Sequence, residues 1–302
     1  MYLVSCLAIL MSSGVLYFLK KMSIKNQFAG FQNEQFTLPF NVADPDTTYI
    51  MPKALKEISG LSYLDTNQVL TVNDEKGFLY TYDFTEGKVV SKIDFGKKGD
   101  YESVTRKNNI VYIAESNGNL KVVDLKQGKK IMEYDTPLSR KNNVEGLCFD
   151  ENRNQLLMVC KGRLEKKSRN RKIKGIYSFD LTTNKFIDNP FKLINLNEER
   201  ENLLPLNLTN DQLSNFTINS RLKSFAPSAM AIDPINSNIY ILSTRGGILT
   251  VMDSNRALLG IYFLSRHTYG QPEGITFDQD GNMYISNEAK STKANILKIL
   301  RS

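Results

Sequence analysis

One pattern recurs along most of this sequence: four short apolar runs separated by turn residues, ending before the next copy begins. Five copies follow one another at residues 57–95, 100–135, 143–162 with 173–187, 227–263 and 272–300. Copies start about 45 residues apart, except for about 83 between the third and the fourth. Four strands at this period are typical of a β-propeller blade. The repeat therefore predicts an all-β propeller with five four-stranded blades.

The end of the chain indicates how such a ring would close. The fifth copy stops at Ser302 after only three strands, so its blade lacks an outer strand. The strand-like segment QFTLPF at 35–40 belongs to no copy. Because an unpaired edge invites association, we expect this N-terminal segment to pair as the outer strand of the last blade and close the ring.

Outside the repeat, the sequence divides into an anchor, a linker and insertions. Residues 2–19 are uncharged and mostly apolar, which predicts a transmembrane helix or an uncleaved signal segment over 1–21. A linker at 22–34 and a propeller domain at 35–302 follow. Insertions are expected at about 161–174 and 197–225, and the second could hide a degenerate sixth blade, which is the alternative to five.

The net charge of +7 comes from one segment. Residues 161–174 hold eight basic residues and one acidic residue, a local charge of 8 − 1 = +7, so the rest of the chain sums to zero. A neutral body with one basic loop argues against nucleic acid as a partner. The loop is interpreted as solvated, or as a contact for anionic lipid or a polyanion.

Cysteine and histidine offer little chemistry. The three cysteines show no metal-ligand spacing, and His267 is the only histidine, which excludes His-rich metal sites. Counting outward from the hairpin turn sets Cys148 opposite Leu157, so no disulfide with Cys160 is expected. His267 is interpreted as an ordinary surface or packing residue.

Acidic residues recur at the start of the first strand of a copy, at Glu57, Glu102, Glu145 and Glu273, with Ser228 in the fourth copy. First strands line the channel of a propeller, and the ends of second strands reach the same face. Oxygen donors without His or Cys suit Ca²⁺. The expected metal ligands are Glu57, Asp74, Glu102, Glu115, Glu145, Glu273 and Glu288. The expected anion-binding residues are Lys161, Arg163 and Arg245. The alternative is that each glutamate caps backbone N–H groups or pairs with a basic residue.

Several motifs in order, EISGLSY, GDYESV, VEGLCFD, PSAMAIDP and QPEGITFDQDGNMYISNE, resemble the SdiA-regulated (YjiK-like) family of β-propellers. The resemblance covers roughly residues 50–300. It implies an extracytoplasmic, often membrane-tethered propeller related to calcium-responsive envelope proteins described as phytase-like. It also implies that Glu57, Glu102, Glu145 and Glu273 occupy the family's acidic positions.

These observations lead to a calcium-binding envelope propeller that acts as a binding, sensing or scaffold module. The alternatives are a Ca²⁺-dependent phosphoesterase or a lactonase-like hydrolase that uses a metal at the channel mouth. A phosphoesterase needs a dense aspartate cluster, and only Asp74 and Asp100 lie near the predicted mouths, which favours binding over catalysis. We expect a monomer at the cell membrane, with its propeller in the periplasm and a small anionic ligand or an envelope protein as partner.

Overall fold

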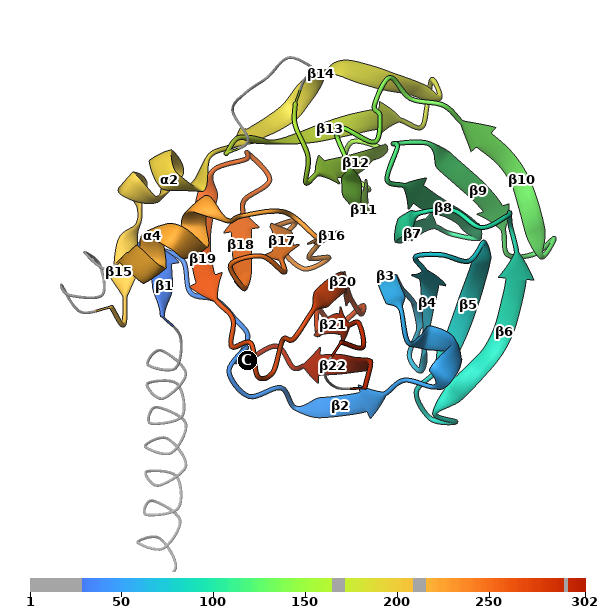
Figure 1. Ribbon diagram of the computed structural model, residues 1–302, viewed down its shortest axis with the longest axis horizontal. Helices are drawn as coiled ribbons and strands as arrows, with labels where there is room; N and C mark the ends of the chain where they lie inside the picture. Colours follow the sequence, from blue (N-terminus) through green and yellow to red (C-terminus); the bar gives the residue numbers. More distant parts are fainter. Residues whose placement is uncertain (1–28, 165–171, 209–215, 291–292) are drawn as a thin grey trace, which may run out of the picture.

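The computed structural model describes residues 29–164, 172–208, 216–290 and 293–302. Within this part, five antiparallel sheets stand around a central axis as the blades of a propeller (Figure 1). The prediction of five blades is confirmed. The anchor expected at 1–21 lies outside the described residues, and none of the helices that the structure describes is long and apolar enough to cross a membrane.

The first three blades are four-stranded, and their strands follow one another from the channel to the rim. Blade 1 consists of β3 (Ile58–Asp65), β4 (Gln68–Asn73), β5 (Phe78–Asp83) and β6 (Lys88–Asp94). Blade 2 consists of β7 (Tyr101–Lys107), β8 (Ile110–Glu115), β9 (Leu120–Asp124) and β10 (Lys129–Tyr134). Blade 3 consists of β11 (Val144–Asp150), β12 (Gln155–Cys160), β13 (Lys174–Asp180) and β14 (Lys185–Ile194).

The last two blades recruit strands from elsewhere in the sequence. Blade 4 consists of β16 (Ala229–Ile232), β17 (Ile239–Ser243), β18 (Ile248–Met252) and β19 (Leu258–Phe263), extended outward by β1 (Gly30–Gln32) and β15 (Leu204–Leu206). Blade 5 consists of β20 (Pro272–Phe277), β21 (Met283–Asn287), β22 (Asn295–Ile299) and β2 (Thr47–Ile50).

An N-terminal strand does close the ring, but the segment predicted for it was wrong. The outer strand of blade 5 is β2, which pairs with β22 from Thr47↔Lys298 to Ile50↔Asn295. The segment 35–40 makes only an isolated bridge, Phe40↔Arg301. Its apolar residues Leu38 and Phe40 are buried between blades 4 and 5 instead. The run is apolar because it fills a seam between blades.

The linker and the insertion also contribute to blade 4. Strand β1 lies within the segment 22–34, which was expected to be a linker, and it pairs with β19 and with β15. The insertion at 197–225 overlaps α2 (Leu196–Glu199) and contains η2 (Arg200–Asn202), β15 and α4 (Phe216–Lys223). A short 3-10 helix, η1 (Lys53–Leu55), leads into blade 1.

The hydrophobic core consists of five clusters, and each fills the seam between two neighbouring blades. Strands in the middle of a blade are therefore buried on both faces, as β17 and β18 show along their whole length. This is the physical reason why their sequences, IYILS and ILTVM, are continuously apolar rather than alternating. The inner strands contact one another in the order β3, β7, β11, β16, β20 and back to β3.

Tight turns between the third and fourth strands explain part of the repeat. In DFTEGK and DLKQGK an aspartate ends the third strand and accepts backbone N–H bonds from the turn. The residues Gly87 and Gly128 adopt φ of 62° in these turns. Such a positive φ favours glycine, and the aspartate fixes the hairpin.

Candidate functional site

The acidic residues of three inner strands stand at β-bulges. The pairing of β7 with β8 shifts register between Tyr101 and Ser103, which leaves Glu102 as the extra residue. Glu145 and Glu273 take the same place in β11 and β20. A bulge re-aims one side chain and locally ends regular pairing. The repeat therefore builds one acid-presenting bulge into each of these three blades.

The inner strands approach closely enough to fix these bulges relative to one another. A Cβ added to Gly146, the residue after Glu145, would lie 2.8 Å from Met230 N in blade 4. The residue after Glu273, Gly274, faces Ser59 O of blade 1, at 2.5 Å from its own hypothetical Cβ. Only glycine permits such approach of neighbouring backbones. In VEGL and PEGI, an acidic residue at a bulge is thus followed directly by a glycine that contacts the neighbouring blade.

Hydroxyl groups add direct ties between neighbouring inner strands. Ser59 Oγ donates to Glu102 O at 2.7 Å, and Ser103 Oγ accepts from Leu147 N at 3.0 Å. In blade 4, Ser228 stands in place of the acid and donates to Pro272 O at 2.7 Å. These bonds connect the inner strands of blades 1 to 2, 2 to 3 and 4 to 5. The channel mouth is consequently a preorganised polar ring.

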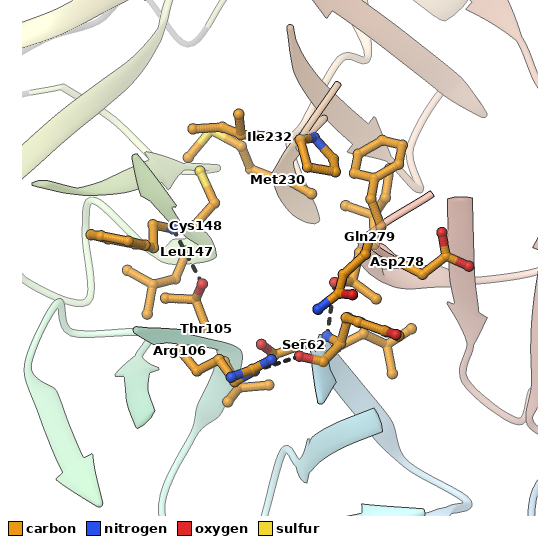
Figure 2. Close-up of a pocket in the computed structure, with 18 residues that line it drawn as sticks. Ser62, Thr105, Arg106, Leu147, Cys148, Met230, Ile232, Asp278 and Gln279 are labelled. Carbon is orange, nitrogen blue, oxygen red and sulfur yellow. Dashed lines mark hydrogen bonds between the residues drawn. The ribbon is translucent and has the colours of Figure 1, made fainter. Parts of the chain in front are cut away.

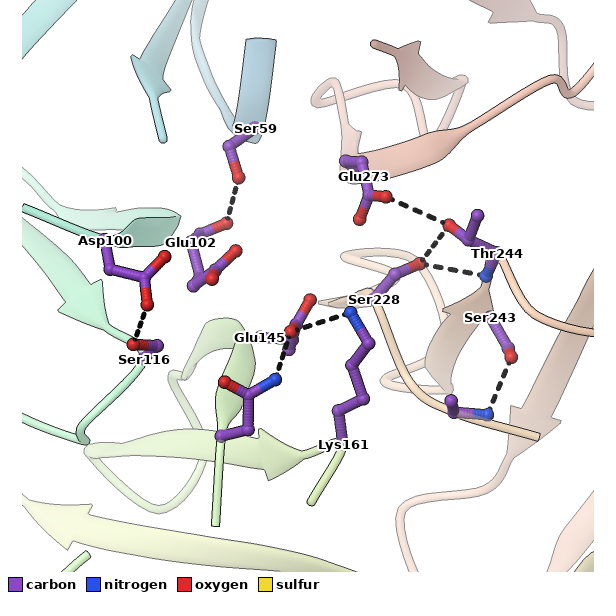
Figure 3. Close-up of polar contacts among 12 residues, drawn as sticks. Ser59, Asp100, Glu102, Ser116, Glu145, Lys161, Ser228, Ser243, Thr244 and Glu273 are labelled. Carbon is purple, nitrogen blue, oxygen red and sulfur yellow. Dashed lines mark hydrogen bonds and ion pairs between the residues drawn. The ribbon is translucent and has the colours of Figure 1, made fainter. Parts of the chain in front are cut away.

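Three of the predicted glutamates gather at this mouth, as Figure 3 shows, together with a fourth acid that the sequence analysis did not include among the ligands. Asp100 lies beside Glu102, and Ser116 Oγ donates to its carboxylate. The side chain of Glu145 is 4% exposed. We call Asp100, Glu102, Glu145 and Glu273 the acid cluster.

Two members of the acid cluster, Glu102 and Glu273, keep their protons to an unusually high pH. Burial raises the pKa of Glu102 to about 9, and the carboxylates of Glu145 and Asp100 add to this rise. Burial and the nearby Glu145 raise the pKa of Glu273 to about 8. Thr244 Oγ1 lies 3.3 Å from Glu273 Oε1 and partly opposes this change. At neutral pH, both Glu102 and Glu273 are therefore mainly protonated.

Among the described residues, Lys161 is the basic residue that pairs with the acid cluster. Its Nζ lies 2.9 Å from Glu145 Oε1, which also accepts from Asn143 Nδ2 at 2.5 Å. Burial lowers the pKa of Lys161, but the carboxylates of Glu145, Glu273 and Glu102 outweigh it and the net direction is upward. Burial raises the pKa of Glu145, and its bonds with Lys161 and Asn143 oppose that rise. Lys161, which the sequence analysis named as an anion-binding residue, thus stands among the carboxylates, and its direct partner is Glu145.

Glu57, Asp74 and Glu288 form a second acidic group, which adjoins the acid cluster because the carboxylate of Glu288 also raises the pKa of Glu273. Burial raises the pKa of Asp74 to about 6, with Glu57 and Glu288 contributing repulsion. Asp74 Oδ1 is buried without a hydrogen-bond partner among the described residues. Burial also raises the pKa of Glu288, whose carboxylate accepts from Gln271 Nε2. Asp74 N donates to Glu57 O in blade 1, just as Ser116 N donates to Asp100 O in blade 2. Glu57 is therefore the counterpart of Asp100 and not of Glu102.

Glu115 does not join either acidic group. It pairs with Tyr101 in the β7–β8 ladder, one residue before Ser116, which faces Asp100. Successive residues of a strand point to opposite faces, so this one-residue difference turns Glu115 away from the mouth. Its carboxylate lies 3.6 Å from Lys121 Nζ. In this structure Glu115 therefore takes part in an ion pair and is not brought together with the other expected ligands.

The remaining sequence predictions concern residues away from the acid cluster. Arg163 and Arg245 line a cleft beside Lys161. His267 is exposed on a loop, where its backbone N donates to Ser265 Oγ. Cys148 pairs with Leu157 as predicted, and Cys148 and Cys160 are both free and buried.

The other end of the channel has a different character. A cavity of about 200 Å³ opens there among the C-terminal ends of the inner strands (Figure 2). Its lining is mixed, with apolar residues such as Leu147, Met230 and Ile232 beside Arg106. The guanidinium of Arg106 donates to Tyr63 O and Leu64 O, both at 2.7 Å. The two mouths thus differ in charge, and carboxylates dominate only the one described above.

A metal ion at the acid cluster would need side chains to move. In the part of the chain that the structure describes, no three His, Cys, Asp or Glu side chains already converge as a metal-ligand set. The donor chemistry nevertheless fits a hard cation, because carboxylates offer oxygen donors and Glu145, Glu273 and Glu102 share the one ammonium of Lys161. A bound cation would replace the protons that repulsion and burial now retain.

The fold and this mouth define a five-bladed β-propeller with an acid-lined channel entrance. The chain belongs to the SdiA-regulated family, whose sequence profile matches residues 46–291. No curated protein matches it significantly.

Among solved structures, a glutaminyl cyclase from Myxococcus xanthus is 10% identical, with a TM-score of 0.57, and the match covers 85% of this chain and 95% of that chain. A structural genomics protein of unknown function from Bacteroides thetaiotaomicron is 15% identical, with a TM-score of 0.50. That match covers 81% of this chain and 56% of the other. At these identities the likeness concerns the fold alone.

Proposed function

We propose that this protein is a binding module whose propeller takes up a calcium ion at the acid cluster. The observation that carries this proposal is the environment of Glu102. Its carboxyl group is half-buried beside the exposed Asp100, and neither has a basic group within 4 Å among the described residues. A carboxyl group that burial and neighbouring carboxylates keep from ionising is stabilised by a proton or by a cation.

Glu102 and Glu273, with Asp100 and Glu145 beside them, would hold the ion. Ca²⁺ accepts six to eight oxygen ligands in flexible geometry, which suits carboxylates from separate blades better than the strict octahedron of Mg²⁺. The ion would supply the positive charge that lets these carboxyl groups ionise. Because the acids come from blades 2, 3 and 5, their shared ion would also connect inner strands across the channel.

The location of the propeller is part of the same proposal. The apolar run at 2–19, followed by Lys20 and Lys21, supports a membrane tether. We place the propeller on the outer side of the cell membrane, where calcium reaches millimolar concentration and extracellular modules with weak sites respond to it. Proteolysis of intact spheroplasts should then cleave the propeller without detergent, and full protection would place it inside the cell.

Thermal unfolding of the full chain tests the calcium site. After chelator treatment, 1 mM Ca²⁺ should raise the melting temperature, and 1 mM Mg²⁺ should raise it less, because a ligand that binds only the folded state stabilises it. Glu102→Gln together with Glu273→Gln should abolish the calcium response. The matched control Glu115→Gln changes an acid outside the cluster and should keep the response. An equal response in the double variant would refute the site.

A further inference from the structure

A strongly basic cleft lies next to the acid cluster, on the side of Lys161. Its volume is about 450 Å³, and its lining combines segments of blade 3 with the end of α4 and the start of blade 4. Among the lining residues that the structure describes, seven are basic and none is acidic. Five of them are Arg140, Lys141, Arg163, Lys223 and Arg245. A cavity of this size falls in the range of small-molecule pockets, roughly 300–1,000 Å³.

The blade 3 wall of the cleft is built rigidly. Beyond the β11–β12 ladder, Arg163 N donates to Lys141 O at 2.9 Å and Gly162 N donates to Asn142 O at 2.7 Å. Asn142 is buried, and its Nδ2 donates to Arg163 O at 2.9 Å. A Cβ on Gly162 would lie 2.1 Å from Lys141 O, so this close pairing requires glycine. Lys141 and Arg163 are consequently held side by side by their backbones.

The opposite wall positions a third cation. Ala226 and Arg245 form an antiparallel bridge at the end of the first hairpin of blade 4. Ser243 Oγ accepts from Ala226 N and donates to Arg245 O, at 2.9 and 2.5 Å. At the floor, Lys174 is 6% exposed, and its Nζ donates to Lys161 O at 2.7 Å. Charged groups thus surround the cleft from both blades.

Five of these charges have no acidic partner in the part of the chain that the structure describes. Within the described residues, no acidic side chain lies within 4 Å of the five basic groups named above, and no side-chain hydrogen bond fixes them. Lys161, in contrast, pairs with Glu145. Like charges gathered in one cavity repel each other, so an anion entering the cleft relieves repulsion and gains several charge-assisted bonds.

We infer that this cleft binds a phosphate-bearing ligand with at least two anionic groups. Three of the cations are arginines, whose planar guanidinium matches phosphate oxygens in pairs. One phosphate alone would leave much of the cleft unfilled. The same chemistry is presented by a soluble phosphorylated molecule and by the headgroups of an anionic membrane. The inference is independent of the calcium site, with which the cleft shares only Lys161.

The test uses tripolyphosphate as the soluble probe and phosphatidylcholine vesicles, with or without phosphatidylglycerol, as the membrane probe. Binding to the full chain is measured by calorimetry and by vesicle co-sedimentation at low ionic strength. The cleft variant carries Arg140→Gln, Arg163→Gln and Arg245→Gln, which remove exposed or half-buried charges without breaking an internal bond. The control variant Lys53→Gln, Lys98→Gln and Lys129→Gln removes the same charge from exposed positions elsewhere.

The inference predicts that wild type and control bind alike and that the cleft variant binds at least about tenfold more weakly. Raised salt should weaken binding as well. Tripolyphosphate binding identifies a soluble source, and binding only to phosphatidylglycerol vesicles identifies a membrane source. The double variant Glu102→Gln with Glu273→Gln should leave either result unchanged. A failure of the calcium proposal can therefore be distinguished from a failure of the anion-binding inference. Equal loss in both basic variants, no binding to either probe, or tighter binding of duplex DNA than of tripolyphosphate would overturn the inference.

Discussion

Replacing Glu102 by glutamine should stabilise the calcium-free protein, although the residue belongs to the proposed site. The pKa of Glu102 rises from 4.5 to about 9 on folding, mainly because of burial. Between these two values the folded state holds a proton that the unfolded chain has lost. Stability therefore falls as pH rises through this window, by about 1.4 kcal/mol per pH unit. Glutamine keeps the neutral form and nearly the same shape at every pH.

The magnitude follows from the same window. At pH 7, about 2.5 pH units above the ordinary pKa, holding the proton on Glu102 costs the folded state about 3 kcal/mol. Glu102→Gln should raise the free energy of unfolding by up to this amount at pH 7 and by almost nothing at pH 4.5. The gain should be lost in the presence of Ca²⁺, because only the wild type would then bind the ion.

Urea denaturation in a chelating buffer at pH 5, 6, 7 and 8 measures this directly. The difference between variant and wild type should grow steadily with pH. The control Glu115→Gln should show no such growth, since Glu115 lies beside Lys121 rather than in the acid cluster. A stability difference that is independent of pH, or a variant less stable than the wild type at pH 8, would refute the reasoning.

Three further predictions concern the scaffold. Phe40 is fully buried against Tyr240 and Phe277, so Phe40→Ala should lower the free energy of unfolding by about 3–5 kcal/mol in urea denaturation, and a loss below 1 kcal/mol would contradict its place in the seam. Gly146→Ala should destabilise by about 1–3 kcal/mol because the new Cβ meets blade 4, whereas Gly270→Ala, which meets nothing within 4 Å, should be neutral; equal effects would refute this contact. In a Cys6→Ser background, Cys148 and Cys160 should react with a thiol reagent only at the rate of unfolding, because both are buried and burial raises the pKa of Cys160 to about 12; rapid labelling would disprove their burial.

The sequence was sufficient to predict the five blades because their periodicity has one physical origin. Every blade buries both faces against its neighbours, so each copy needs the same four apolar runs and the same turns. Closure was harder to place. Strand β2 is largely exposed and only weakly apolar, whereas 35–40 is apolar because Leu38 and Phe40 fill a seam. In a single sequence, a short apolar segment that is buried between blades resembles a short apolar strand that pairs at a sheet edge.

The acid cluster was predicted in part. Glu102, Glu145 and Glu273 do come together, since they follow the repeat, but the bulges that aim them cannot be read from apolar spacing. Because the bulge was not included, Glu57 was treated as equivalent to Glu102, although the counterpart of Glu57 in blade 2 is Asp100. The available signal was the position of the acid. Glu102 and Glu273 are the second residues of their strands, whereas Glu57 stands one residue before β3 begins. Glu115 was misplaced by a single residue, which is enough to reverse the face of a strand.

Calorimetric titration of Ca²⁺ at pH 7, in two buffers of different ionisation enthalpy, tests most directly whether acids from separate blades share one ion. The pKa values of about 9 for Glu102 and about 8 for Glu273 mean that both carboxyl groups hold protons before the ion arrives. Binding should therefore release about two protons for each Ca²⁺ bound. Binding of Ca²⁺ without proton release, or no binding at millimolar concentration, would contradict the account.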